Sequence, residues 1–494
     1  MKELAQLTHT TRYLVLVTSL ASLQLGYNHW LCYSDTKLIR QFYNLTYYRM
    51  KKNAHRNDTF HDNLVIGFAT SLFPVGAMVG SLLVGVLVDR FGRKWTVMID
   101  NYISLVCSMF MTCANLQHGF IFAMFSRFFI GISMGIFSGV IPMYLLEISP
   151  LALRGSIGMV PHFFVVIGVQ MAQIFSFPEL LGTVEDWPAL VSLPGLLAIW
   201  QILLLPSCPE SPRYLFIQKN KEEEAKEALK LLRFQSDVAD ELEELRREDR
   251  LEKDEKKMNT LRLLGYRQLR WHLVSVIVIV VGQQLSGVNV IYLCIEKFLF
   301  STGLSYKKAR YFQMMTTALL ILAILYGMYI VDTKGRKLQL LVGFGMATVF
   351  CLLLTVTIDL EVKFAWLSFL NNVLINIFLL VHAMGPSALI NLVTGELFLQ
   401  SSRSSAYVVG QFLHWFLNYT TVLIFVYAEN YVGHYSLLLA SPISLVTFFY
   451  ILKIVPETKD KTFLEIQSLV PLHKAKDLTG NRCNCEQQSP NWSV

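Results

Sequence analysis

The sequence has little charge for its length. Only 16% of its 494 residues are Asp, Glu, Lys or Arg, whereas 53% are hydrophobic. A soluble globular protein carries about 25% charged residues. The shortage argues for a polytopic membrane protein. Short strands of alternating hydrophobicity, which would indicate a membrane β-barrel, are missing as well.

Other features of common protein classes are also missing. The eight cysteines are scattered and form no framework of paired extracellular residues. The chain has no nucleophile–base set, no metal-ligand spacing and no Gly-rich phosphate loop. We therefore expect neither an enzyme nor a bound metal or cofactor.

Long apolar runs occupy most of the chain. A bilayer core of about 30 Å needs about 20 apolar residues per helix, and we predict twelve such spans. They lie near 13–33, 64–88, 96–116, 120–145, 156–178 and 187–206 and, after a polar gap, near 271–295, 308–331, 336–358, 364–394, 405–428 and 434–456. We expect an all-α membrane protein with an N-terminal six-helix half (1–206), a cytosolic linker with short helices (207–268), a C-terminal six-helix half (269–458) and a cytosolic tail (459–494).

The formal charge of +7 does not indicate a nucleic-acid partner. The basic residues cluster in short loops such as 90–94 and 334–337, which is the positive-inside pattern of membrane proteins. This pattern places those loops and both termini in the cytosol, and we expect a multi-pass protein of the plasma membrane. The polar segment 34–63 then lies outside, where the sequons at Asn44 and Asn57 are predicted glycosylation sites.

Three sequence marks occur twice, in the same order. "DRFGRK" at 89–94 returns as "DTKGRK" at 332–337, and "PESPR" at 209–213 is echoed by "PETKD" at 456–460. Between them, a Glu and an Arg spaced by seven positions recur as Glu147/Arg154 and Glu396/Arg403. The chain therefore consists of two homologous halves. Parallel halves are typical of transporters whose substrate site lies between them near the membrane midplane.

Four charged residues of the repeated marks lie at the predicted cytosolic ends of the spans in each half. Such residues can simply anchor the topology by snorkelling. Their paired repetition instead favours a network of ion pairs that closes the cytosolic side and breaks when it opens. The predicted network consists of Asp89, Arg93, Glu147 and Arg154 with Asp332, Arg336, Glu396 and Arg403.

The motifs resemble those of a known family, the sugar-porter branch of the major facilitator superfamily. The matching pieces are "DRFGRK", "RFFIGISMGIFSGVIPMYLLEISPLALRG", "PESPRYLF", "GQQLSGVN", "DTKGRK", "GELFLQSSR" and "VPETKDKTF". Within that branch the chain is most similar to the fructose-type facilitative hexose transporters. The resemblance implies alternating access, and it implies that a monomer is sufficient for transport.

Polar residues within the spans are the candidate substrate site. A sugar offers hydroxyl groups without charge, so its site needs neutral donors and acceptors together with aromatic faces. "GQQLSGVNVIY" supplies Gln283, Gln284 and Asn289, which could otherwise serve as helix–helix hydrogen bonds. The further candidates are Tyr27, His162, Tyr292, His382, Ser387, Asn391, His414, Trp415 and Asn418.

The first predicted span contains no Asp or Glu. Proton-coupled transporters need an ionisable group within the membrane, and proton-coupled relatives carry an acid on this helix. We therefore expect uniport.

The sequence departs from the family pattern at several positions. His162 stands where the family has a sugar-contacting glutamine, and Asn391 stands where glucose-preferring members have tryptophan. Ala388 and Ile390 replace two prolines of span ten. We expect facilitative transport of a hexose, with fructose first and glucose second. The alternatives are transport of another small metabolite such as urate, and a non-transporting sugar sensor.

Overall fold

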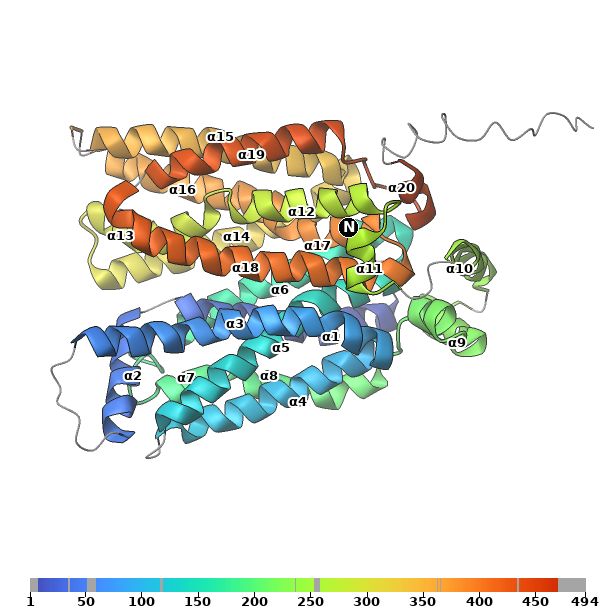
Figure 1. The fold of residues 1–494 in the computed structure, drawn as a ribbon, viewed down its shortest axis with the longest axis horizontal. Coiled ribbons are helices and arrows are strands. Elements are labelled where there is room, and N and C mark those ends of the chain that lie inside the picture. The colour runs from blue at the N-terminus through green and yellow to red at the C-terminus, as the bar shows by residue number, and fades with distance from the viewer. Residues whose placement is uncertain are drawn as a thin grey trace, which may run out of the picture.

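The computed structural model describes residues 8–33, 36–50, 59–115, 119–235, 237–252, 258–361, 363–364, 366–432 and 435–469. In these ranges the regular elements are helices, and no strand is found. Figure 1 shows two groups of long helices lying side by side, one from each half of the chain. The predicted all-α architecture is confirmed.

The first half contains the six predicted spans. They are α1 (His9–Tyr33), α3 (Thr59–Phe91), α4 (Arg93–Thr112), α5 (Gly119–Ile148), α6 (Arg154–Phe175) and the pair α7 (Trp187–Ser192) and α8 (Pro194–Leu204). The additional helix α2 (Thr36–Met50) lies at one end of this half, close to α7 (Figure 1). The sixth span is divided at Pro194, because a proline has no N–H to continue the helical hydrogen bonds.

The second half repeats this arrangement. Its spans are α12 (Arg270–Gln284) with α13 (Val288–Ser301), α14 (Tyr306–Lys334), α15 (Arg336–Glu361), α16 (Leu367–His382) with α17 (Ala388–Leu397), α18 (Gln400–Val432) and α19 (Ser436–Lys453). Eight helical stretches in the described ranges are long and apolar enough to cross a membrane. The helix α1 is more polar, and it buries polar residues such as Thr18, Ser19 and Gln24 inside the bundle.

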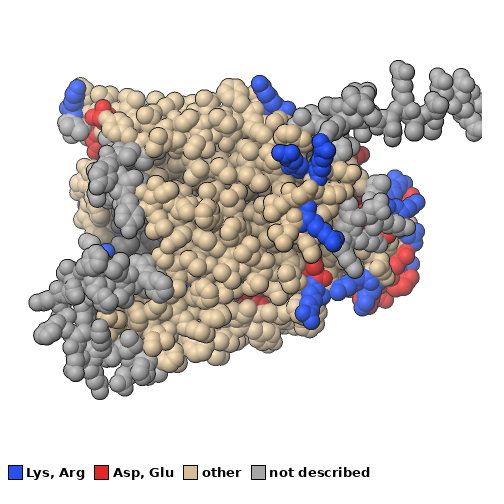
Figure 2. All heavy atoms as spheres, in the orientation of Figure 1, with Lys and Arg blue, Asp and Glu red and all other residues tan. Residues whose placement is uncertain are grey.

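The polar linker forms short helices at one end of the bundle. These are η5 (Tyr214–Gln218), α9 (Glu222–Arg233), α10 (Ala239–Leu251) and α11 (Thr260–Gly265), and α20 (Phe463–Leu469) joins them. Figure 2 shows that charged side chains gather at this end, whereas the belt between the two ends is almost free of them on the face shown. This distribution agrees with a bundle that crosses a bilayer and has its linker outside it.

Each half has its own hydrophobic core, and two pairs of long helices join the halves. The helix α3 packs against α18, and α6 packs against α14. Tyr407, Val408 and Trp415 of α18 are buried in the core of the first half. The second half therefore contributes large side chains directly to the core of the first.

Two spans of the second half are broken near their middle. The seventh span is interrupted between α12 and α13, where Gly287 has φ 91°. The tenth is interrupted by the π-helical turn η6 (Ala383–Ser387), which contains Pro386. Although Ala388 and Ile390 replace two prolines of the family pattern, an irregular turn built on Pro386 is present in this span.

We expect Gly287→Ala to destabilise the protein. A left-handed backbone costs an L-residue roughly 1–2 kcal/mol, and an added Cβ would lie 3.2 Å from the Cys351 Sγ and 3.3 Å from the Ala440 Cβ. The Tm of the detergent-solubilised variant should fall by a few degrees. The control is Gly265→Ala, where a Cβ meets nothing within 4 Å. An unchanged Tm for Gly287→Ala would contradict this explanation of the break.

Candidate functional site

In each half, a buried glutamate near the linker end pairs with the arginine of the repeated loop. The Arg93 Nη2 lies 2.9 Å from the Glu147 Oε1, and the Arg93 Nε also donates to that oxygen at 3.1 Å. The Arg336 Nη2 lies 3.2 Å from the Glu396 Oε1. All four residues are at least nine-tenths buried. Removing one partner of such a pair typically costs about 3–5 kcal/mol, because a buried charge is left alone.

The third repeated mark, "PESPR" and its echo "PETKD", also contacts the repeated loop of its own half. The Glu210 carboxylate accepts the backbone N–H groups of Arg93 and Lys94 at 3.0 and 3.2 Å, at the start of α4. The Glu457 carboxylate does the same for Arg336 and Lys337 at the start of α15, both at 3.0 Å. The first N–H groups of a helix lack internal partners, and the helix dipole favours a negative charge there.

Glycine makes this close approach possible in both loops. Gly92 and Gly335 have φ 93° and 96°, and a Cβ on either would lie 2.5 Å from a carboxylate oxygen of Glu210 or Glu457. Three marks that are far apart in the sequence therefore form one arrangement, built twice. A hydroxyl completes each copy: the Ser211 Oγ donates to Glu147, and the Thr458 Oγ1 donates to Glu396 at 2.5 Å.

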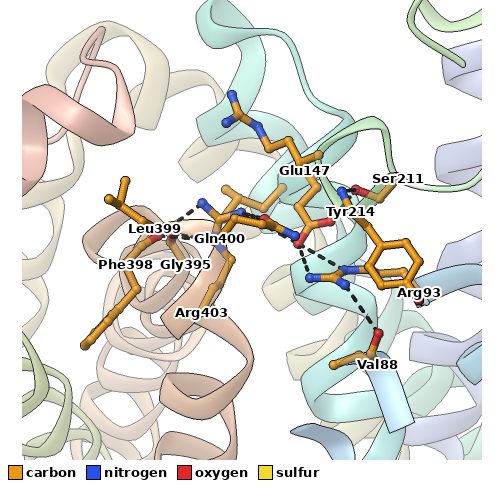
Figure 3. Close-up of polar contacts among 12 residues, drawn as sticks. Val88, Arg93, Glu147, Ser211, Tyr214, Gly395, Phe398, Leu399, Gln400 and Arg403 are labelled. Atoms are coloured by element: carbon orange, nitrogen blue, oxygen red, sulfur yellow. Dashed lines mark hydrogen bonds and ion pairs between the residues drawn. The ribbon is translucent and has the colours of Figure 1, made fainter. Parts of the chain in front are cut away.

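The two copies are tied to each other across the halves. The Arg403 Nη1 of α18 lies 3.6 Å from the Glu147 Oε1 (Figure 3). The Ser404 Oγ donates to the Asp89 Oδ2 at 3.2 Å. These contacts join α18 of the second half to α3 and α5 of the first.

A third link runs in the opposite direction. The Ser156 backbone N–H, near the start of α6, donates to the Asp332 Oδ2 at 3.1 Å. Gly155 allows this approach, since a Cβ there would lie 2.2 Å from the Asp332 Oδ1. Asp332 also lies 3.7 Å from Arg336. The same carboxylate therefore contacts Ser156 of the first half and Arg336 of the second.

Arg154 behaves differently from the other predicted network residues. It forms no ion pair within the described chain; its Nη1 donates to the Lys461 carbonyl at 3.4 Å, and its guanidinium lies 4.0 Å from the Phe463 ring centroid. The Arg213 and Arg403 guanidiniums lie 4.6 and 4.2 Å from the same ring. Phe463 of α20 is therefore surrounded by arginines from both halves.

The linker helix α10 adds a further bridge. Arg213 pairs with Glu244 at 3.0 Å and with the buried Glu248. The Glu252 carboxylate accepts the Ser401 N–H at 3.1 Å, at the start of α18. The linker also reaches the first half, because the Arg233 Nη1 of α9 donates to the Ile148 carbonyl at 3.1 Å. It therefore contacts both halves at the end where they are tied together.

Near the break in the seventh span, five of the predicted substrate residues come together. The Gln284 Nε2 is 2.7 Å from both the Gln283 Oε1 and the His414 Nδ1. The Asn289 Nδ2 donates to the Gln284 Oε1 at 2.8 Å, and the Asn418 Nδ2 donates to the Asn289 Oδ1 at 3.3 Å. The cluster is neutral and presents amide and imidazole groups from α12, α13 and α18.

His382 connects the breaks of the seventh and tenth spans. Its Nε2 lies 2.9 Å from the Ser286 Oγ, and its Nδ1 lies 2.8 Å from the Ser387 Oγ. On α17, the Asn391 Oδ1 accepts the Gln411 Nε2 at 2.7 Å. These contacts bring His382, Ser387 and Asn391 into the polar interior of the second half.

The first half contributes His162. This residue is half-buried on α6 and makes no hydrogen bond within the described chain. It lies within electrostatic range of His382 and His414. His162 therefore faces the second half, as its predicted role requires.

The remaining three candidates lie differently. The Tyr27 hydroxyl donates to the Leu190 carbonyl at 2.9 Å within the core of the first half, so the structure does not bring it to the cluster. Trp415 is 2% exposed, and its Nε1–H donates to the Ser138 Oγ at 3.3 Å. Tyr292 is 46% exposed on α13.

Sequence reasoning missed several residues that the structure places at these sites. Gln411 lies three and seven positions before His414 and Asn418, and this helical spacing could have identified it. His29 has no such signal: its ring lies 5.9 Å from that of Trp415, and only this contact between α1 and α18 reveals it. Glu210 and Glu457 lie within repeated marks that gave no indication of helix capping.

The other predicted sites receive less support. Asn44 lies on α2, and Asn57 lies outside the described residues. In the part of the chain that the structure describes, no three His, Cys, Asp or Glu side chains are placed to hold a metal ion.

Comparisons with known proteins agree with this architecture. A family model described as "Sugar (and other) transporter" matches residues 14–470. The human "Solute carrier family 2, facilitated glucose transporter member 5" is 41% identical over 463 residues, which cover 93% of this chain and 92% of the relative. The mouse protein of the same name is 39% identical over 473 residues, covering 95% and 94%. Human member 7 is 37% identical over 453 residues, covering 91% and 87%.

Solved structures show the same fold. A proton:xylose symporter, XylE, bound to 6-bromo-6-deoxy-D-glucose has a TM-score of 0.79 at 19% identity, covering 93% of this chain and 99% of that one. The transporter FucP in its outward conformation has a TM-score of 0.59 at 12% identity, covering 89% and 97%.

We expect Glu147→Gln to loosen the contact between the halves more than Glu396→Gln does. Glu147 forms an ion pair across the halves with Arg403, whereas the described ion pair of Glu396, with Arg336, stays within its own half. Hydrogen–deuterium exchange should become faster at residues 154–158 and 401–405 in Glu147→Gln. Equal acceleration in the two variants would show that the Arg403 contact does not hold the halves together.

Proposed function

The chain belongs to the sugar transporter family, and we propose that it is a uniporter that carries a hexose across the plasma membrane, fructose first and glucose second. Its termini and its linker helices would lie in the cytosol, in keeping with the basic loops at that end. Transport would proceed by alternating access of a site between the two halves.

The neutral polar cluster at the break of the seventh span is the observation that carries this proposal. Gln283, Gln284 and Asn289 lie within an apolar span, where polar groups are costly unless they are paired. They pair with one another and with His414, so the cluster is stable without a ligand. These side chains could exchange their hydrogen bonds to one another for hydrogen bonds to sugar hydroxyls. The exchange would involve no charged group and would cost little net free energy.

The linker-end network supports the alternating-access part of the proposal. In the described conformation Arg403, Ser404 and Ser156 tie the halves together at that end. Opening toward the linker requires these contacts to break together. Several partly desolvated contacts of this kind can bias an equilibrium between two states, although an exposed ion pair alone contributes only about 0–1 kcal/mol.

The positions of the acids in the first half support uniport. The helix α1 contains no Asp or Glu. The carboxylates Asp89 and Glu147 lie at the linker end and take part in the ties described above. Asp100, on α4, is fully buried beside Ser133 of α5, within the first half. A carboxylate that could couple a proton to the sugar is therefore missing from the described residues of the cluster.

A second candidate cargo is urate or a similar weak acid. The observation that favours it is His162, which lacks a hydrogen-bond partner in the described chain and lies near two further histidines. An imidazole offers a donor that an anionic ring could use in place of a sugar hydroxyl.

Uptake into proteoliposomes separates these functions. Labelled fructose, glucose and urate would be followed with and without a pH gradient. Hexose uptake faster than in empty vesicles and unaffected by the gradient supports uniport. Faster uptake of urate than of either hexose would favour the second candidate. Sugar binding without uptake of any of the three would instead indicate a non-transporting sensor.

We expect Gln284→Ala to lower fructose kcat/KM by about tenfold or more, because an unpaired sugar hydroxyl costs about 1–3 kcal/mol. The control is Gln24→Leu. Gln24 bonds Asn101 at 3.1 Å inside the first half, away from the cluster. This change should lower the Tm and leave KM unaltered. A Gln284→Ala variant with wild-type kcat/KM would remove Gln284 from the site.

We expect His162→Gln to raise hexose transport. A glutamine amide offers two N–H donors and a carbonyl acceptor to sugar hydroxyls, whereas a neutral imidazole offers one donor and one acceptor. The measurement is kcat/KM for fructose and glucose in the same vesicles. If neither value changes, His162 does not contact the sugar.

A further inference from the structure

The end of the first half that lies opposite the linker contains a buried cation. Arg127 lies near the start of α5 and is 3% exposed. Its guanidinium lies 5.0 Å from the ring centroid of Trp187, at the start of α7. Phe42 and Tyr43 of α2, both 1% exposed, pack against the same tryptophan at 4.5 and 5.8 Å. The cation is therefore enclosed by aromatic side chains.

This guanidinium has no anionic partner in the described chain. Arg127 forms no ion pair there, and its buried Nη1 has no hydrogen-bond acceptor. The buried hydroxyl of Tyr43 adjoins this guanidinium, which can only donate to it, so the phenolic proton also has no acceptor among the described residues. Arg127 and Tyr43 lie within electrostatic range of each other, and Cys32 of α1 lies within range of both. Two unsatisfied donors thus lie near one another in a buried site.

None of the neighbouring groups that the structure describes can neutralise the guanidinium. Burial raises the pKa of the Tyr43 phenol, so Tyr43 remains a neutral donor. Asp100 lies beside Ser133, which is six residues further along α5 than Arg127, a rise of about 9 Å. The cation–π contact with Trp187 attracts the cation but accepts none of its N–H bonds. A buried charge without a partner is strongly unfavourable.

We propose that a small inorganic anion of halide size, such as chloride, binds beside Arg127 and Tyr43 and accepts hydrogen bonds from the guanidinium and from the phenolic hydroxyl. Both groups are donors, and an anion supplies the acceptor and the charge that the described residues lack. The aromatic walls and the low exposure favour a small ion over a lipid headgroup or a large organic acid. This site lies outside the polar cluster and does not depend on the transported cargo.

The bound anion would also fix α2. This helix lies across the end of the first half (Figure 1), and the site joins it to α5 and α7. Loss of the anion would leave the cation alone beneath α2. The whole protein should therefore be more stable with the anion than without it.

Thermal unfolding of the full-length protein in detergent tests this proposal. Chloride would be exchanged for gluconate, a much larger anion, at constant ionic strength. The Tm should rise by a few degrees with chloride and reach a plateau. Arg127→Gln should remove this response, and Tyr43→Phe should shift its midpoint about tenfold toward higher chloride. A wild-type Tm that does not depend on chloride would overturn the proposal.

Two further variants distinguish a specific site from a general salt effect. Cys32→Asp places a carboxylate near Arg127 and should make the Tm independent of chloride while the protein still folds. Arg310→Gln changes an arginine at the same end that already donates to the Ser176 carbonyl at 3.0 Å, and it should keep the wild-type response. A chloride response that persists in Cys32→Asp, or that is lost in Arg310→Gln, would exclude Arg127 as the site.

Discussion

The Glu147 carboxylate sets the main constraint on this structure. It is 5% exposed, and taking such a charge from water costs several kcal/mol unless it is paired and hydrogen-bonded. Arg93, Ser211 and Arg403 meet that need from three separate segments. The start of α4, the end of α5, the segment after α8 and the start of α18 must therefore lie together. The second half satisfies the same requirement around Glu396, which explains why the repeated marks stay together in both halves.

The two copies are related but not identical, and the difference falls where they meet. Arg403 reaches across to Glu147, whereas its counterpart Arg154 stacks on Phe463. The first half is thus bound to the second through an ion pair and through Ser404, whereas the reverse link depends on Asp332 and the start of α6. Two such unlike links need not break at the same stage of a conformational change.

The sequence allowed prediction of the main features that depend on periodicity or repetition. The twelve spans, the two halves and the clustering of Gln283, Gln284 and Asn289 follow from apolar runs and from spacing along one helix. The partners of Arg154, Tyr27 and Trp415 could not be predicted. Each depends on which face of a helix meets a neighbour: Tyr27 turns toward Leu190, and Trp415 turns into the core of the other half. Arg127 was missed because a single arginine in an apolar span gives no indication that its partner is missing.

The contacts of His382 fix the direction of the hydrogen bonds in the interior of the second half. Ser286 uses its single proton on the Gln283 carbonyl, so the imidazole Nε2 must carry the hydrogen that it shares with Ser286. The Nδ1 is then the acceptor for Ser387. Three hydrogen bonds consequently form a row of aligned dipoles from the turn in the tenth span to the break in the seventh. A change of geometry at either break would change the direction of these hydrogen bonds. The two irregular turns are therefore linked through neutral hydrogen-bond dipoles.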